Sequence, residues 1–171
     1  INDWILAADA SVDQHQMWTP CYSFSKGELA SVNTFHTNCD GKGPTVFVMK
    51  LSTGKVVGGY AAEHWESPAK KDHVASERSA TNFLFSLTTM NQFKLLQSGG
   101  KFDPAAFAQM QDANIGPAFG RGVVGGYDLA AFADRSGWSG QCYIGETYGC
   151  NDSNVKLLAA CRKNFCGEQG W

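Results

Sequence analysis

The stretch that decides the fold is FHTNCDGKGPTVFVMK, residues 35–50. Its second half is rich in β-branched and aromatic residues, and a short STG turn separates it from KVVGGYAAEHW, residues 55–65. Two such runs on either side of a short turn predict a β-hairpin. The first half crowds His36, Cys39 and Asp40 into one short segment, so the first question is whether these side chains perform chemistry or hold the fold together.

Two helices are expected around the strand-rich segments. Leu29, Val32 and Phe35 recur every three residues, which predicts a helix of about ten residues before the hairpin. An Asp-Pro step opens residues 103–111, and this step is typical of a helix N-terminus. Between these two segments, the polar residues 67–80 predict a long surface loop, with room for a helical turn.

Strand-like runs dominate the rest of the chain. They lie at residues 81–88, 92–97, 127–133 and 154–165, and the alanines and leucines of the last run leave a helix open as its alternative. We expect the run at 92–97 to pair with the run before it. Many strands with a few short helices predict a mainly β, α+β fold: two antiparallel sheets packed as a β-sandwich and flanked by short helices.

Length and charge narrow the functional classes. A chain of 171 residues predicts a single domain, residues 1–171. The formal net charge of -2 offers no basic face for nucleic acid or for an anionic membrane. No apolar run approaches the roughly 18 residues that a membrane-spanning helix needs. No cofactor motif or metal-ligand spacing is recognisable, so we expect neither a cofactor nor a metal, although calcium binding stays open.

Six cysteines, an even number, favour disulfides formed in an oxidising compartment. The absence of a C-x2-C pair argues against zinc, and free or mixed thiols remain the alternative. We expect a bridge between Cys142 and Cys150, which are close in sequence and flank a glycine–tyrosine turn. The pairing of the others is open, with a preference for Cys21 meeting Cys161 or Cys166. The six are Cys21, Cys39, Cys142, Cys150, Cys161 and Cys166.

Two further features fit a secreted or extracellular protein. The chain begins at Ile1, and its opening residues have neither the basic start nor the apolar run of a signal peptide. A processed chain is one interpretation, and a shortened one is the other. Asn151 begins an N-D-S sequon, so a secreted chain would be able to carry a glycan there.

Four blocks in order resemble the TLDc domain, the module of oxidation-resistance proteins. They are FHTNCDGKGPTVFVMK, GKVVGGYAAEHWES, NFLFSLT and IGPAFGRGVVGGYDLAAF. The resemblance covers about residues 18–165. It implies a two-sheet sandwich surrounded by helices, with no established reaction, and a role in oxidant protection or in binding the vacuolar proton pump. This chain departs from the family pattern in its six cysteines, in its insertion RGVVGGYDL and in Tyr127, where the family usually has histidine.

The motif around Cys39 allows two interpretations. On a helix, His36 and Cys39 share a face, so the imidazole would be able to activate the thiol as a nucleophile. No orienting third group or oxyanion donor is recognisable, however. We therefore expect structural roles: Phe35 packs inward, His36 bonds a backbone carbonyl or a carboxylate, Cys39 is buried or bridged, and Gly41 and Gly43 adopt positive φ. The protein is then not an enzyme, with thiol redox chemistry as the alternative.

The expected function is carbohydrate binding, like that of a lectin. Two glycine-rich loops combine aromatic, acidic and guanidinium side chains, which suit sugar rings and hydroxyls. Trp65 is expected to pack in the core instead. Multivalency is a common source of lectin avidity, so a homo-oligomer is a corollary. The alternative is an oxidation-resistance-type domain that acts through protein contacts or thiols. The predicted ligand-binding residues are Arg121, Tyr127, Asp128, Trp138, Tyr143 and Tyr148.

Overall fold

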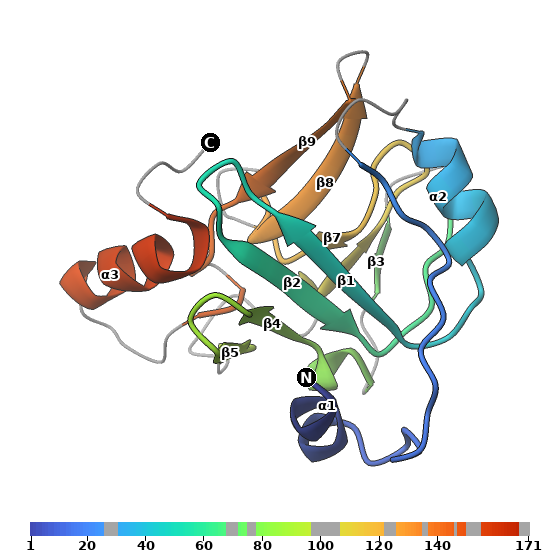
Figure 1. Ribbon diagram of the computed structural model, residues 1–171, viewed down its shortest axis with the longest axis horizontal. Helices are drawn as coiled ribbons and strands as arrows, with labels where there is room; N and C mark the ends of the chain where they lie inside the picture. Colours follow the sequence, from blue (N-terminus) through green and yellow to red (C-terminus); the bar gives the residue numbers. More distant parts are fainter. Residues whose placement is uncertain are drawn as a thin grey trace.

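The fold was analysed in a computed structural model that describes residues 1–25, 31–67, 72–74, 78–96, 107–121, 126–134, 137–145, 147–149 and 155–167. Two antiparallel sheets form its centre, with strand orders β1-β2-β4-β5 and β3-β6-β7-β8-β9. Helices lie around them (Figure 1). The predicted mainly β sandwich with short flanking helices is confirmed. Among the described residues, no helix is both long and apolar enough to cross a membrane.

The first sheet is the part of the fold that the sequence predicted best. The expected hairpin pairs Thr45 with Ala61 and Lys50 with Val56. The expected pairing of 81–88 with 92–97 is also present, with Leu84 opposite Phe93. The strands of this sheet are β1 (Thr45–Lys50), β2 (Val56–Ala61), β4 (Phe83–Ser86) and β5 (Asn91–Lys94).

The second sheet was predicted only at β8. Its strands are β3 (Asp72–Val74), β6 (Gln109–Gln111), β7 (Ala118–Phe119), β8 (Leu129–Asp134) and β9 (Gly137–Cys142). β3 and the 3-10 helix η1 (Arg78–Thr81) lie within the expected loop. The expected helix over 103–111 is wrong in its described part, because Gln109 and Gln111 donate to backbone carbonyls of residues 63–64 and hold this segment extended.

Helices α1 (Asn2–Ala8), α2 (Val32–Cys39) and α3 (Val155–Cys166) complete the described elements. The predicted helix before the hairpin is confirmed from Val32 onward, and its hydroxyl cap Ser31 accepts a hydrogen bond from the backbone of Thr34 at 3.1 Å. Leu29 lies outside the described residues. The strand expected over 154–165 is wrong, and its helical alternative is correct. Cys161 and Phe165 lie four residues apart, so they share one face of the helix, and both side chains are buried.

Both faces of the first sheet are covered. Alternate side chains of a strand point to opposite faces, so Leu84 joins the core between the sheets while Phe83 and Phe85 face the other way. On that outer face Ile5 of α1 packs against them, and Tyr60 stacks on Phe83 with ring centroids 5.4 Å apart. Figure 1 shows α1 lying near the start of β4. α1 therefore covers part of the outer face of the first sheet.

The two sheets come into close contact at Gly59 of β2. A Cβ placed on this residue would lie 2.7 Å from the ring of Phe119 on β7 and 2.9 Å from Leu84. The side chain of Phe119 thus occupies the space that any larger residue at position 59 would need. This explains why a glycine stands in the middle of a buried strand, where glycine otherwise weakens the structure.

We expect Gly59→Ala to destabilise the protein by about 1–3 kcal/mol, the usual cost of overpacking a core, because Phe119 would have to move. The measurement is urea unfolding of the purified variant. Gly126→Ala is the matched control: its Cβ would meet the amide end of Gln141 at 3.1 Å, and that flexible side chain is able to shift. Equal losses in the two variants would contradict the proposed contact.

Candidate functional site

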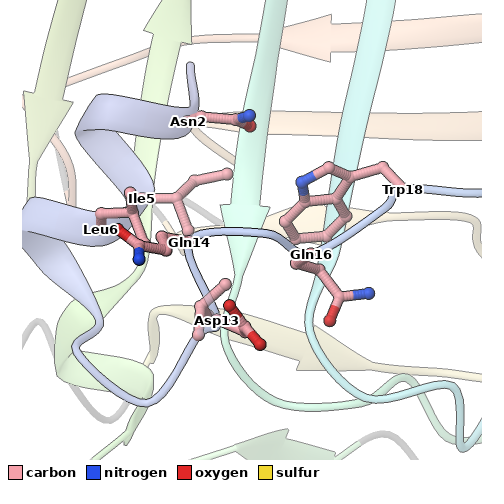
Figure 2. A pocket seen from close by; sticks show the side chains of 8 residues that line it. Asn2, Ile5, Leu6, Asp13, Gln14, Gln16 and Trp18 are labelled. Atoms are coloured by element: carbon pink, nitrogen blue, oxygen red, sulfur yellow. The ribbon is translucent and has the colours of Figure 1, made fainter.

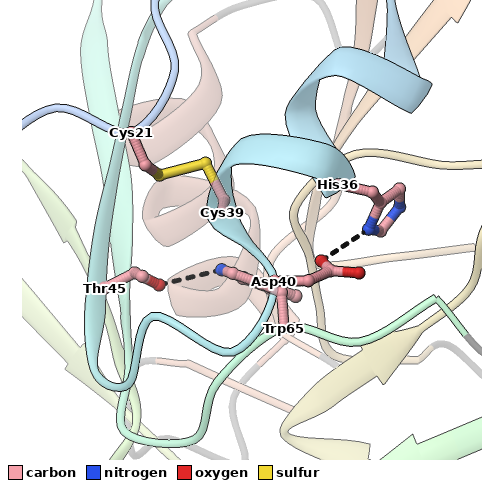
Figure 3. Close-up of a disulfide and its surroundings, with 6 residues drawn as sticks. All are labelled: Cys21, His36, Cys39, Asp40, Thr45 and Trp65. Atoms are coloured by element: carbon pink, nitrogen blue, oxygen red, sulfur yellow. Dashed lines mark hydrogen bonds and ion pairs between the residues drawn. A yellow bond between two sulfur atoms is a disulfide. The ribbon is translucent and has the colours of Figure 1, made fainter.

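The motif at the end of α2 contains a cysteine that forms a disulfide. Cys39 is fully buried and bridged to Cys21, with 5.2 Å between the two Cα atoms. The expectation that Cys39 is buried or bridged is confirmed. The preference for Cys21 meeting Cys161 or Cys166 is wrong, because the segment after α1 runs toward α2 and brings Cys21 to the end of that helix (Figure 3). The bridge leaves no thiol at Cys39.

The imidazole of His36 is enclosed by acceptors. Its Nδ1 lies 2.8 Å from a carboxylate oxygen of Asp40, and its Nε2 lies 3.1 and 2.9 Å from the carbonyl oxygens of Asp112 and Ile115. Carboxylates and carbonyls only accept, so every contact is satisfied when both ring nitrogens carry a proton. The expected bonding of His36 is confirmed in both of its forms. Both ring nitrogens are therefore engaged by groups of the protein itself.

Trp65 joins this motif to the second block of the sequence. The backbone amide of Gly41 donates to the carbonyl of Trp65 at 3.0 Å, and the indole N–H donates to the hydroxyl of Thr45 at 2.8 Å. Its ring lies between Phe35 and Phe119, at centroid distances of 6.0 and 5.6 Å. The expected core role of Trp65 is thus confirmed. The expected positive φ of both motif glycines is present as well, at 68° and 79°.

The acidic side chain predicted to bind ligand in the first glycine-rich loop is not exposed to solvent. Asp128 is fully buried, and its carboxylate accepts hydrogen bonds from the backbone amides of Thr147 and Tyr148 at 2.7 and 2.8 Å. Gly120, at φ 73°, leaves room for this carboxylate, because a Cβ there would overlap it. The predicted ligand-binding role of Asp128 is therefore wrong, and the residue holds a turn.

The neighbouring tyrosines are also inside the protein. The hydroxyl of Tyr148 donates to the carbonyl of Ala108 at 2.6 Å, and its ring is fully buried. Tyr127 is buried against Met110 and lies 5.7 Å from the ring of Phe132. A sugar in solution cannot reach either ring, so the predicted binding roles of Tyr127 and Tyr148 are wrong. Tyr148 belongs to the main core cluster together with Phe119, and Tyr127 belongs to a separate cluster together with Met110.

Two predicted binding residues are accessible. The guanidinium of Arg121 lies 5.9 Å from the centre of the Phe107 ring. Tyr143 is 41% exposed, and the guanidinium of Arg162 lies 3.8 Å above its ring. The side chain of Trp138 lies outside the described residues. Of the predicted binding residues whose side chains are described, Arg121 and Tyr143 are therefore the accessible ones.

A second disulfide joins the end of β9 to the end of α3. Cys142 is bridged to Cys166, with their Cα atoms 5.7 Å apart. The expected bridge from Cys142 to Cys150 is wrong, because the folding of α3 onto the sheet places Cys166 beside β9. Cys161 is also disulfide-bonded. Cys150 and the sequon at Asn151 lie outside the described residues.

A small hollow lies on the outer surface between α1 and the segment that follows it (Figure 2). The space that it encloses is about 10 Å³, about enough for one water molecule. In Figure 2, Ile5 and Asn2 point from α1 toward the indole of Trp18, which is 37% exposed. Sequence reasoning missed this hollow, although the polar and aromatic run DQHQMW at 13–18 is a signal for it. The lining residues are Asn2, Ile5, Leu6, Val12, Asp13, Gln14, Gln16 and Trp18.

We expect His36→Ala to lower the free energy of unfolding by about 1–3 kcal/mol, because the change leaves buried acceptors unpaired. His64→Ala is the matched control, since this histidine also contacts a carboxylate, that of Glu66 at 2.7 Å, but is largely exposed. Exposed pairs contribute about 0–1 kcal/mol. Chemical denaturation of both variants provides the comparison. A well-folded His36→Ala protein with unchanged stability would refute the structural role of the imidazole.

We expect the free energy of unfolding to decrease at alkaline pH because of Tyr148. Burial raises the pKa of its phenol well above the ordinary value, and the charge of Asp128 raises it further. The unfolded chain therefore ionises first, so stability is complete below about pH 10 and falls as the pH rises above it. Unfolding free energies measured across this range should fall more steeply for the wild type than for Tyr148→Phe. Parallel curves would show that the phenol does not contribute.

Comparison with known proteins assigns the family. The TLDc domain family model matches residues 5–165, nearly the whole chain. A comparison with curated proteins finds no match. The match agrees with the blocks identified in the sequence, and each of the four contributes to the buried contacts described above: the first two meet at Trp65, and the last two meet the sheet–sheet core at Leu84 and Phe119. The chain belongs to the TLDc domain family.

Proposed function

We propose that this TLDc domain is a secreted, disulfide-stabilised binding protein that catalyses no reaction, with a carbohydrate or a glycoprotein glycan as its ligand. The observation that carries the proposal is the bridge between Cys21 and the fully buried Cys39, which lies in the family motif. Disulfides of this kind form and persist in oxidising compartments and are rare in the cytosol. The bridge between Cys142 and Cys166 supports the same compartment.

The state of the motif supports a binding role over catalysis. A cysteine nucleophile needs a thiolate and a base within reach. Cys39 is bridged, and both ring nitrogens of His36 contact acceptors of the protein itself. The motif therefore has the chemistry of a structural connection between α2, the Trp65 segment and the 112–115 turn.

Carbohydrate is the proposed ligand class because of the surface chemistry of the N-terminal hollow. A half-exposed tryptophan and planar polar side chains line it together. Aromatic faces suit the C–H surface of a sugar, and amides and carboxylates suit its hydroxyls. The net charge of -2 makes a polyanionic ligand a poor match. Self-association, which would increase the avidity of a lectin, stays a prediction.

The second candidate is an oxidation-resistance-type domain that acts through protein contacts or through thiols. Family membership favours protein contacts. The exposed pair of Tyr143 and Arg162 is of the type enriched in such contacts, since tyrosine and arginine are common at the centres of interfaces. Thiol chemistry would require reduction of the bridges first. The thiol state of the native protein therefore separates the two candidates.

Non-reducing peptide mapping of protein secreted from cells should recover Cys21 linked to Cys39 and Cys142 linked to Cys166. Each bridge should stabilise the fold by about 3 kcal/mol in the chain-entropy model, so reduction should lower the thermal midpoint. The same preparation should bind at least one glycan on an array. Free thiols at these four cysteines, with full stability under reducing conditions, would favour the second candidate.

A further inference from the structure

The four methionines of the chain differ in their access to solvent. Met17 is 84% exposed and Met90 is 63% exposed, whereas Met110 is 4% exposed. Met49 is half-buried and packs against the main core cluster, and a Cβ placed on Gly140 would lie 2.6 Å from its terminal methyl group. Methionine commonly fills irregular gaps in hydrophobic cores. Two of the four thioether sulfurs are therefore presented to solvent, and the other two are shielded by packing.

The segment that carries Met17 is fastened at both ends. Before it, the carboxylate of Asp9 accepts a hydrogen bond from the buried hydroxyl of Tyr60 at 2.8 Å. After it, Cys21 is bridged to Cys39. Met17 itself belongs to none of the hydrophobic clusters formed by the described residues. Its side chain is therefore held in solvent by a fastened segment and contributes no packing to those clusters.

Met90 lies in the turn that joins β4 to β5 (Figure 1). Its φ is 53°, and among the described residues it is the only non-glycine with a positive φ. Two hydroxyls fix the turn: that of Thr88 accepts from the backbone of Val56 at 2.8 Å, and that of Ser86 accepts from the backbone of Thr89 at 3.2 Å. A left-handed backbone disfavours any side chain with a Cβ. The Met90 side chain thus strains the turn and is not compensated by burial.

The chemistry that an exposed thioether offers is the transfer of two electrons to an oxidant, which converts methionine to methionine sulfoxide. With hydrogen peroxide, a lone pair of the Sδ atom attacks one oxygen and the O–O bond breaks. That oxygen stays on the sulfur, and the other leaves as water with both protons. Thiols would compete for the oxidant, but the described cysteines are all disulfide-bonded. They are Cys21, Cys39, Cys142, Cys161 and Cys166.

We infer that Met17 and Met90 are oxidant-accepting sites at which the protein consumes hydrogen peroxide, one molecule at each thioether, without loss of its fold. Oxidation makes a methionine side chain polar, which disrupts hydrophobic cores. Met17 and Met90 already face water, so their sulfoxides displace no core contact. Oxidation of Met110, in contrast, would place a polar group in a buried cluster. These two sites are independent of the proposed ligand-binding function.

The test treats the full chain, with its disulfides intact, with millimolar hydrogen peroxide and follows each methionine by peptide mass spectrometry. Met17 and Met90 should gain one oxygen about tenfold faster than Met110 or more, because packing excludes the oxidant from the buried thioether. Met49, which is half-buried, should react at an intermediate rate. In concentrated urea the four rates should converge. Equal rates at all four methionines of the folded protein would overturn the inference.

Peroxide consumption by leucine variants provides the second arm. Leucine keeps the approximate volume of methionine and removes the sulfur, and such exchanges are well tolerated. Met17→Leu and Met90→Leu should each remove half of the peroxide consumed in the fast phase, and the double variant should lack that phase. Met110→Leu is the matched control, because its thioether is buried. Its fast phase should equal that of the wild type.

Thermal unfolding of the oxidised protein tests whether the fold survives. Wild-type protein that carries sulfoxides at Met17 and Met90 alone should unfold at the same midpoint as untreated protein. A clear loss of stability would show that these side chains support the fold, and it would overturn their role as expendable oxidant acceptors. A fast phase that persists in the double variant would place the reaction elsewhere and would also overturn the inference. Neither result would affect the proposed binding function, which the glycan array tests separately.

Discussion

The fold depends on the position of Trp65. This one residue contacts three parts of the protein. Its indole N–H donates to the hydroxyl of Thr45 at the start of β1, its backbone carbonyl accepts from the amide of Gly41, and its ring lies between Phe35 of α2 and Phe119 of β7. Phe119 in turn fills the space left by Gly59. The helix, the hairpin and the second sheet therefore meet at one aromatic cluster, and the polar ends of that cluster are hydrogen-bonded, as buried polar groups must be.

Two carboxylate contacts explain the parts of the sequence that most resemble catalytic or binding motifs. Asp40 holds His36 at the end of α2, while the imidazole reaches across to the 112–115 turn. Asp128 holds the amides of residues 147 and 148. In each case a titratable side chain organises the backbone of a distant loop. Such groups are expensive to bury without partners, so the fold retains them together with the residues that satisfy them.

The covalent links extend this organisation to the two ends of the described chain. One bridge fastens the N-terminal segment to α2, and the other fastens α3 to β9. The first link also fastens the segment that follows α1, whose Val12 packs with Ile5 against the outer-face cluster of Phe83 and Phe85. A binding role at this surface would thus use the most peripheral layer of the sandwich and leave the family core unchanged.

The sequence alone indicated the family through the resemblance of four ordered blocks, which the family model confirms. It also determined the first sheet and the helix before the hairpin, because local patterns fix these elements: turns, β-branched runs and the spacing of apolar residues. It was wrong about Gln109–Gln111, whose helical start is overridden by side-chain bonds to residues 63–64, and about Asp128, Tyr127 and Tyr148, whose exposure depends on how the strands pack. Only the tertiary structure decided the partners of Cys21 and Cys142 and the hollow at Trp18. Those features join residues from different elements, and a linear pattern carries no information about which elements come to lie side by side.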